Sequence, residues 1–195
     1  IRDVYPSENV LVCDAGVILA DVQKAAEDIG RLFPLSLASE GSARIGGLLS
    51  TNAGGVNVLR YGNARAQCLG LEVVRPDGTI WHGLTRLRKD NTGYDLRNLM
   101  IGAEGTLGII TGAALKLAPK PFGLGAAMMA VASPEAALEL LAMAGAVIGE
   151  AVSAFEIMHR AGFDFLDEVG PNYKQPFDQV PEWCVLIDVG LPAGL

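Results

Sequence analysis

The chain has 195 residues, half of them hydrophobic and 19% charged, so there is enough apolar material for one or two packed domains. Its formal net charge of −7 and the lack of a Lys/Arg cluster argue against a nucleic-acid partner. Cys13, Cys68 and Cys184 fall singly in apolar runs, which predicts buried free thiols rather than disulfides.

The sequence also shows no metal, membrane or export signal. His82 and His159 fall in unrelated segments, so we expect no histidine-based metal centre. No apolar run reaches the roughly 20 residues of a membrane-spanning helix, and no signal peptide opens the chain. We therefore expect a cytoplasmic location, with peripheral membrane association as an alternative. Because the chain starts and stops as if inside domains, we expect a fragment.

The first part of the chain predicts a strand and then a helix. Residues 10–14 (VLVCD) are a β-rich apolar run closed by Ala15-Gly16. Apolar residues at 19, 22, 26, 29 and 33 follow the helical period and Pro34 stops it, so we expect a helix over 19–33.

A first glycine run, GSARIGGLLSTNAGG, occupies residues 41–55. Ile45, Leu48 and Leu49 keep enough periodicity for a short helix between two glycine-lined turns. Glycine allows close backbone approach and positive φ, so the run predicts N–H groups free to face an anion. A structural crossing without a ligand is the alternative. A second glycine run, GAEGTLGIITG at 102–112, favours one ligand shared by both runs.

The middle of the chain predicts a hairpin with two dissimilar faces. Strands at 69–75 and 79–82 flank the turn signal Pro76-Asp77-Gly78. Strand alternation places two groups of residues on opposite faces: Leu69, Leu71 and Val73 on one, and Gly70, Glu72 and Val74 on the other.

The polar residues 86–95 predict a surface loop, which a short helix at 96–101 and a buried strand at 108–118 follow. Pro119-Lys120-Pro121 is a stiff break, so we predict one domain over 1–120 and another over 121–195. Beyond the break, strands at 126–131, 152–157 and 183–189 alternate with helices. The first helix is capped by Ser133 with Pro134 at its first position, and the second covers 160–169. This order predicts an incomplete α+β sandwich.

No nucleotide or nucleophile motif identifies a reaction. GxGxxG after a strand and GxxxxGK[ST] are both missing. Ser42, Ser50 and Thr51 have no histidine nearby in the sequence and are interpreted as hydroxyls that cap the backbone. Glu104 lies in an apolar glycine-rich turn and needs a partner if it is buried. A ligand contact, a helix cap and a salt bridge all stay open for it.

Two polar segments near the glycine runs each allow two interpretations. Residues 90–95 (DNTGYD) either satisfy their own backbone or brace the second glycine run. Arg60 and Tyr61 either lie on the surface or anchor an anionic ligand.

Three long, ordered motifs resemble a known family. They are EGSARIGGLLSTNAGGVNVLRYG at 40–62, GLEVVRPDG at 70–78 and LRKDNTGYDLRNLMIGAEGTLGIIT at 87–111. Together they resemble the FAD-linked 2-hydroxy-acid dehydrogenases and oxidases of the vanillyl-alcohol-oxidase-like superfamily. This group contains the glycolate oxidase flavin subunit, D-lactate dehydrogenase and D-2-hydroxyglutarate dehydrogenase.

The resemblance implies an α+β fold in two parts. Residues 1–120 would be the second subdomain of the FAD-binding domain, with a mixed or antiparallel sheet and flanking helices but without the family's first flavin loop. Residues 121–195 would be an incomplete, ferredoxin-like portion of the substrate domain.

The resemblance also implies the cofactor contacts. FAD would be bound non-covalently, since the matching flavin motifs contain no histidine. Arg44 stands where many relatives carry a small polar residue. No catalytic residue and no metal ligand is identified, because the family's substrate-side residues would lie outside the chain. The residues implied to line FAD are Gly41, Ser42, Ile45, Gly46, Gly47, Asn52, Gly54, Gly55, Glu104, Gly105, Ile109 and Ile110.

The implied reaction is hydride transfer from C2 of a D-2-hydroxy acid, of lactate, glycolate or 2-hydroxyglutarate type, to flavin N5. An unidentified electron acceptor would follow, and the fragment alone would bind FAD weakly or not at all and be inactive. The alternative is a non-catalytic scaffold or interaction subunit that keeps the fold without flavin. Its open apolar seams would favour homo-oligomers.

Overall fold

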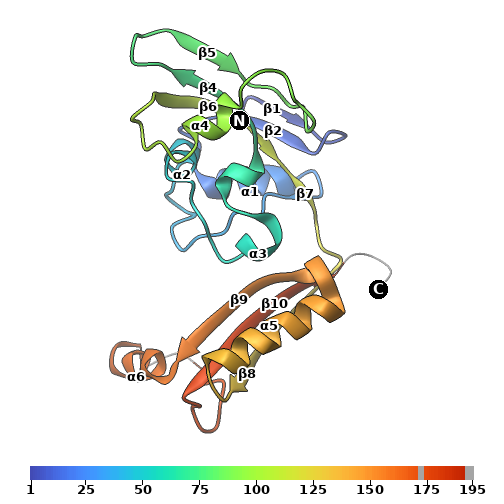
Figure 1. The fold of residues 1–195 in the computed structure, drawn as a ribbon, viewed down its shortest axis with the longest axis vertical. Helices are drawn as coiled ribbons and strands as arrows, with labels where there is room; N and C mark the ends of the chain where they lie inside the picture. Colours follow the sequence, from blue (N-terminus) through green and yellow to red (C-terminus); the bar gives the residue numbers. More distant parts are fainter. Residues whose placement is uncertain (171–173, 192–195) are drawn as a thin grey trace. The chain divides into compact units, whose positions relative to one another are not determined.

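The chain folds into two units, each with its own sheet and its own buried core (Figure 1). The computed structural model describes residues 1–170 and 174–191. The units are Ile1–Lys120 and Pro121–Leu195. The strands of both units pair antiparallel, which confirms the α+β class predicted from the sequence.

The first unit is built on a five-stranded sheet in the order β1-β2-β6-β4-β5. Its strands are β1 (Asp3–Tyr5), β2 (Val10–Asp14), β4 (Cys68–Val74), β5 (Ile80–Gly83) and β6 (Ile109–Lys116). A small ribbon pairs β3 (Arg31–Leu32) with β7 (Ala118–Pro119). The helices are α1 (Leu19–Glu27), α2 (Ile45–Ser50), α3 (Val58–Tyr61), the 3-10 helix η1 (Ala64–Gln67) and α4 (Leu96–Met100).

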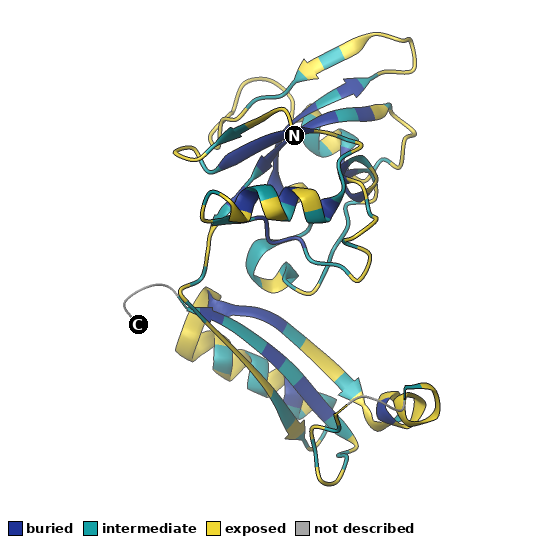
Figure 2. Ribbon diagram, turned by 180° about the vertical axis from the view of Figure 1, so that it is seen from behind, coloured by how far each residue is buried: buried dark blue, intermediate teal, exposed yellow. Residues whose placement is uncertain are grey.

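The main core joins this sheet to α1 and α2 (Figure 2). Leu71 and Leu115 of the sheet lie in one buried cluster with Leu19 of α1 and with Ile45 and Leu49 of α2. Burying each such side chain contributes about 1.5–3 kcal/mol. The apolar positions of the first glycine run therefore fix α2 onto the sheet.

The three cysteines are buried and free, as predicted. Cys13 and Cys68 belong to the main core of the first unit. Burial raises the pKa of both thiols to about 12, so they stay protonated at neutral pH.

The first helix is shorter than predicted. α1 ends at Glu27, and Gly30 adopts a φ of +68° in the turn that follows. The amide of Gly30 donates to the carbonyl of Glu27 at 2.8 Å, which closes the turn. The predicted helix over 19–33 is therefore wrong beyond Glu27, because Arg31–Leu32 forms a strand. Phe33 is buried in the main core although it is not part of the helix.

The predicted hairpin forms, but its first strand changes face near its start. The pairing of β4 with β6 shifts register between Cys68 and Gly70, so Leu69 is an extra, bulged residue. Leu71 and Val73 lie in the main core, whereas Leu69 packs in a separate cluster. The prediction that Leu69 shares a face with Leu71 and Val73 is wrong because the bulge interrupts the alternation.

An ion-pair network centred on Arg2 ties the start of the chain to the sheet. The Arg2 guanidinium donates to Asp14 at 2.7 Å and to Glu72 at 2.8 Å. The Thr111 hydroxyl donates to the same Glu72 carboxylate at 2.9 Å. Gly112 leaves room for this arrangement, since a Cβ there would lie 3.2 Å from the guanidinium carbon of Arg2.

The second unit is a three-stranded sheet covered by one long helix. Its strands, β8 (Gly123–Val131), β9 (Val152–His159) and β10 (Trp183–Leu191), lie in the order β8-β10-β9. Ala137 of α5 (Pro134–Ile148) packs among Val152, Val185 and Ile187. The 3-10 helix η2 (Gly149–Ala151) and α6 (Arg160–Val169) complete the unit. The alternation of strands and helices predicted beyond residue 121 is confirmed.

Both helices of the second unit begin at a capping side chain. The Ser133 hydroxyl accepts from the amide of Ala136 at 3.3 Å, as predicted. His159 accepts from the amide of Ala161 at 3.1 Å through Nδ1, and its ring centroid lies 4.6 Å from that of Trp183. His159 thus has a structural role.

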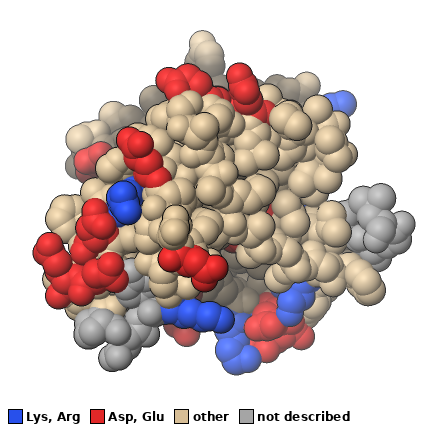
Figure 3. Space-filling model, turned by 90° about the horizontal axis from the view of Figure 1, so that it is seen from below, with Lys and Arg blue, Asp and Glu red and all other residues tan. Residues whose placement is uncertain are grey.

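Apolar side chains remain exposed on the second unit, among them Leu124 at 82% and Val147 at 81%. A broad part of the face drawn in Figure 3 carries no charged side chain. In the described part of the chain, no helix is both long enough and apolar enough to cross a membrane.

Glu72 makes the stability of the first unit depend on pH. The hydrogen bonds from Arg2 and Thr111 hold the pKa of Glu72 below its usual range. A carboxyl group with a lowered folded-state pKa stabilises the fold above its unfolded pKa, and this contribution is lost as the pH falls through the folded value. We predict that Glu72→Gln lowers the free energy of unfolding at neutral pH by about 1 kcal/mol.

The measurement is urea denaturation between neutral pH and pH 3. Glu72→Gln should flatten the acid dependence of the unfolding free energy, whereas Glu139→Gln, on the exposed side of α5, should leave it unchanged. Identical acid profiles for the parent chain and Glu72→Gln would contradict this account.

Candidate functional site

The two glycine runs lie side by side. The amide of Gly102 donates to the carbonyl of Leu49, and the amide of Glu104 donates to that of Ser50, both at 3.0 Å. Leu49 and Ser50 form the last turn of α2, and the carbonyl of Leu49 also accepts from the amide of Asn52 at 3.0 Å. One ligand can therefore touch both runs, as the shared-ligand interpretation requires.

The start of α2 rests on the turn after β2. The amide of Ile45 donates to the carbonyl of Val17 at 3.0 Å, and the amide of Gly46 donates to that of Ala15 at 2.8 Å. The prediction that the N–H groups of this run are free to face an anion is therefore wrong for Ile45 and Gly46. The sequence pattern marks Ala15-Gly16 only as the end of a strand and does not reveal the contact of Ala15 with this site.

Two glycines of the first run are required by the chain's own packing. A Cβ at Gly46 would lie 2.7 Å from the Cβ of Ala15. Gly55 has a φ of +152°, and a Cβ there would overlap the carbonyl oxygen of Ser36. The structural-crossing interpretation accounts for glycine at these two positions without a ligand.

Gly41 and Gly47 have no such explanation. A Cβ at either position would meet nothing within 4 Å, and both residues are exposed. Gly47 lies inside α2, where glycine costs about 0.5–1 kcal/mol relative to alanine. The bare backbone here offers a surface that a flat or bulky group can approach closely.

Three further positions have left-handed backbone where the two runs meet. Asn52 has a φ of +48°, Glu104 of +51° and Gly105 of +80°. Within the described residues, the amides of Gly54, Gly55 and Gly105 have no hydrogen-bond acceptor. Such amides can donate to phosphate or carbonyl oxygens, so the residues present fit a dinucleotide cofactor.

The predicted site side chains divide between core and surface. Ile45 is 1% exposed and Ile110 is 7% exposed, so both support the backbone from the core. Ile109 is 61% exposed and offers apolar surface at the start of β6. The side-chain oxygen of Asn52 accepts from the amide of Arg65 at 3.0 Å. A Cβ at Gly54 would make only ordinary contacts with Asn63 and Val58, both at 3.6 Å.

The polar residues of the runs mostly serve the backbone. Ser42 donates to the carbonyl of Ser39 at 3.3 Å, and Thr51 donates to that of Gly47 at 3.1 Å. These bonds confirm their interpretation as hydroxyls that cap the backbone. Glu104 is exposed, so its carboxylate needs no protein partner. Arg44 is exposed and donates to the carbonyl of Gly16.

The polar loop at 90–95 is explained by its own contacts. Asp90 accepts from the amide of Thr92 at 3.1 Å, and Asp95 caps α4 through the amide of Asn98 at 3.0 Å. The loop at 90–95 thus satisfies its own backbone. The Arg60 guanidinium lies 5.2 Å from the Tyr61 ring centroid.

Comparison with known proteins finds a matching family and several relatives of this chain. Residues 1–83 match the family described as FAD binding domain. The D-2-hydroxyglutarate–pyruvate transhydrogenase of Saccharomyces cerevisiae is 40% identical over 188 residues, which cover 96% of this chain and 38% of that protein. The mitochondrial D-2-hydroxyglutarate dehydrogenase of Bos taurus is 48% identical over 158 residues, covering 81% of this chain and 29% of that protein.

The chain therefore spans about a third of the length of the curated relatives it matches. A solved structure of alkyldihydroxyacetonephosphate synthase superposes with a TM-score of 0.75 at 19% identity, covering 99% of this chain and 37% of that one. The latter likeness concerns the fold alone. The resemblance drawn from the three sequence motifs is confirmed by the curated relatives.

One prediction is overturned by the same comparison. The D-2-hydroxyglutarate dehydrogenases of Bos taurus, Danio rerio, Rattus norvegicus and Arabidopsis thaliana are mitochondrial. The predicted cytoplasmic location is therefore wrong. Location is specified by targeting segments that receptors read, and the composition of a folded domain does not report it.

The contrast between Gly46 and Gly47 gives a stability prediction. Gly46→Ala should destabilise the first unit by about 1–3 kcal/mol, because the new methyl group would overlap Ala15. Gly47→Ala should stabilise it by about 0.5–1 kcal/mol, because the helix gains propensity and nothing is displaced. Urea denaturation of the two variants measures both, and equal effects of the same sign would contradict the assignment.

Proposed function

We propose that the chain supplies part of a flavin-dependent oxidoreductase, because it belongs to the FAD-linked D-2-hydroxy-acid dehydrogenase family. Residues 1–120 would form part of the FAD-binding domain, and residues 121–195 part of the substrate domain. The observation that carries the proposal is the exposed, unpacked backbone at Gly47 in α2, the helix whose end contacts the second glycine run, together with the exposed backbone at Gly41.

The substrate class comes from the relatives. Those with high identity over most of this chain are named for D-2-hydroxyglutarate, and one is a transhydrogenase that pairs it with pyruvate. We assign a D-2-hydroxy acid of lactate, glycolate or 2-hydroxyglutarate type as substrate of the whole protein. A separate electron acceptor, of unassigned chemistry, would complete the turnover.

The cofactor contacts follow the two glycine runs. The residues assigned toward the pyrophosphate, ribityl chain and flavin are Gly41, Ser42, Ile45, Gly46, Gly47, Asn52, Gly54 and Gly55. Those assigned along the cofactor toward the adenine are Glu104, Gly105, Ile109 and Ile110. The amides of Gly54, Gly55 and Gly105 would donate to cofactor oxygens, and exposed Ile109 would contact a flat ring. The side chains of Ile45 and Ile110 are buried in the core, so these residues would hold the backbone in place without touching the cofactor through their side chains.

Bound FAD would supply a flavin N5 that accepts the hydride leaving C2 of the hydroxy acid. The chain's own contribution is binding and orientation, through backbone donors held rigidly by the core beneath α2. Attachment would be non-covalent, since neither glycine run contains histidine. No residue of this chain is assigned as the base.

FAD titration of the purified chain tests the proposal. We expect saturable binding, seen as quenching of flavin fluorescence, that Gly47→Leu weakens roughly tenfold. The Cβ of the new side chain would meet no protein atom within 4 Å, and the rest of the side chain would cover the bare backbone.

Gly145→Leu is the matched control, because Gly145 is also an exposed glycine inside a helix with nothing within 4 Å of its Cβ position. It should leave FAD affinity unchanged. A colourless chain that forms oligomers and ignores added FAD would contradict the proposal and favour the scaffold alternative. Equal affinity for the two variants would also contradict the assigned surface.

A further inference from the structure

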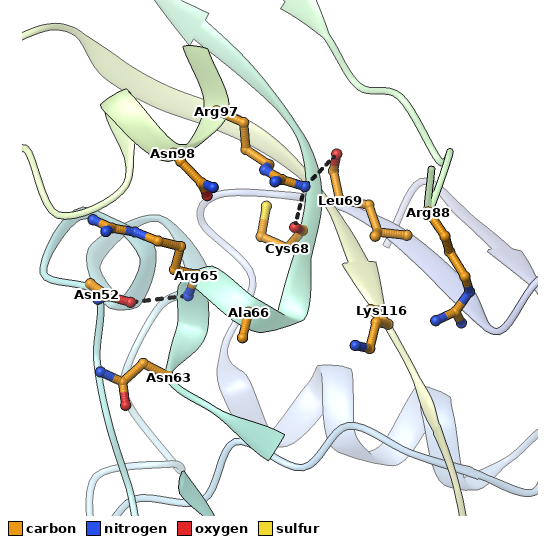
Figure 4. Close-up of a pocket in the computed structure, with 10 residues that line it drawn as sticks. All are labelled: Asn52, Asn63, Arg65, Ala66, Cys68, Leu69, Arg88, Arg97, Asn98 and Lys116. Atoms are coloured by element: carbon orange, nitrogen blue, oxygen red, sulfur yellow. Dashed lines mark hydrogen bonds between the residues drawn. The ribbon is translucent and has the colours of Figure 1, made fainter. Parts of the chain in front are cut away.

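A cavity of roughly 560 Å³ in the first unit concentrates positive charge (Figure 4). Four cationic side chains line it: Arg65, Arg88, Arg97 and Lys116. Three amides, of Asn52, Asn63 and Asn98, add hydrogen-bonding groups. Among the residues that the structure describes, no Asp or Glu lines the cavity. In a chain with a net charge of −7, this grouping needs an explanation.

Separate segments assemble the cavity. Arg65 comes from η1, Arg97 and Asn98 from α4, and Lys116 from the end of β6, while Arg88 lies in the loop after β5. Figure 4 shows Arg65 and Arg88 at opposite sides of the group, with Arg97 between them. The sequence does not show that the four cations lie together, because they are scattered between residues 65 and 116.

The contacts of the arginines orient them but leave most of their charge uncompensated. Arg65 donates to the carbonyl of Ile101 at 2.6 Å, Arg88 to that of Glu8 at 3.3 Å, and Arg97 to that of Cys68 at 3.0 Å. Within the described chain, the one carboxylate that pairs with any of the four cations is Asp95, 3.3 Å from Arg97. Carbonyl groups hold a guanidinium in place without neutralising it.

Two buried polar atoms on lining residues have no partner in the described structure. They are Nε of Arg97, a donor, and Oδ1 of Asn98, an acceptor. The amide orientation of Asn98 is fixed because its Nδ2 donates to Asp95 at 2.8 Å. Leaving such groups unpaired costs stability. Neither atom has accessible surface, so what favours a ligand is the set of four cations that line the cavity.

We propose that this cavity binds a small, multiply charged anion. The shared chemistry is that of hydrogen phosphate and of a hydroxy dicarboxylate. Guanidinium groups recognise both through paired N–H donors, and Lys116 adds a point charge. The volume is within the usual range of small-molecule sites. The proposal does not depend on flavin binding, since Asn52 is the one predicted cofactor residue that lines the cavity.

Isothermal titration of the purified chain at low ionic strength tests the proposal, with inorganic phosphate and malate as separate probes. We expect saturable binding of at least one probe, weakened about tenfold by Lys116→Met and by Arg88→Gln. Arg88 is exposed, so its variant should fold even if Lys116→Met does not. Lys89→Met is the matched control, because Lys89 is an exposed neighbour of Arg88 that does not line the cavity.

The pattern of results identifies the ligand source. Binding of phosphate alone supports a phosphate site, and binding of malate alone or of both probes supports a carboxylate site. No saturable binding of either probe would overturn the proposal, as would an equal loss of affinity in Lys89→Met and Arg88→Gln. Competition by FAD would overturn the separation of this cavity from the cofactor surface.

Discussion

Two backbone hydrogen bonds hold the candidate site together. They run from the amides of Gly102 and Glu104 to the carbonyls of Leu49 and Ser50, at the end of α2. The carbonyl of Leu49 also accepts from the amide of Asn52, so the second glycine run adds partners at a helix end that the first run satisfies only in part. The sheet supports the pair from below, because Ile45 and Leu49 of α2 pack in the same core as Leu71 and Leu115. The cofactor assignment depends on this junction.

The glycines around the junction separate into two physical classes. Gly46 and Gly55 allow the chain to cross itself, and Gly30 ends a helix with a positive φ. A Cβ at Gly41 or Gly47 would meet no other part of the chain, and Gly47 weakens α2 without an internal benefit. Glycine content by itself therefore says little about ligand binding. What supports a cofactor surface is glycine that the fold does not need, placed beside amides without acceptors.

Local sequence patterns predicted many of the helices, strands and turns. The predictions failed where contacts between residues far apart in the sequence determine the structure. The hairpin at Pro76-Asp77-Gly78, the short helix at Ile45 and the helix after Ser133 follow from turn signals, periodicity and capping. The bulge at Leu69 depends on how β4 meets β6, which no window of sequence reports. The helix end at Gly30 was missed because Phe33 continued the helical period. The cationic cavity was invisible for a similar reason, since tertiary packing alone brings its members together.

The central claim is that a dinucleotide binds across the joined glycine runs. Amide hydrogen exchange with and without FAD tests it most directly, because it reports each backbone segment separately. The account predicts that FAD slows exchange in the segments around residues 47–55 and 102–110 and leaves the second unit unchanged. Protection that maps to other segments, or no protection at saturating FAD, would contradict it.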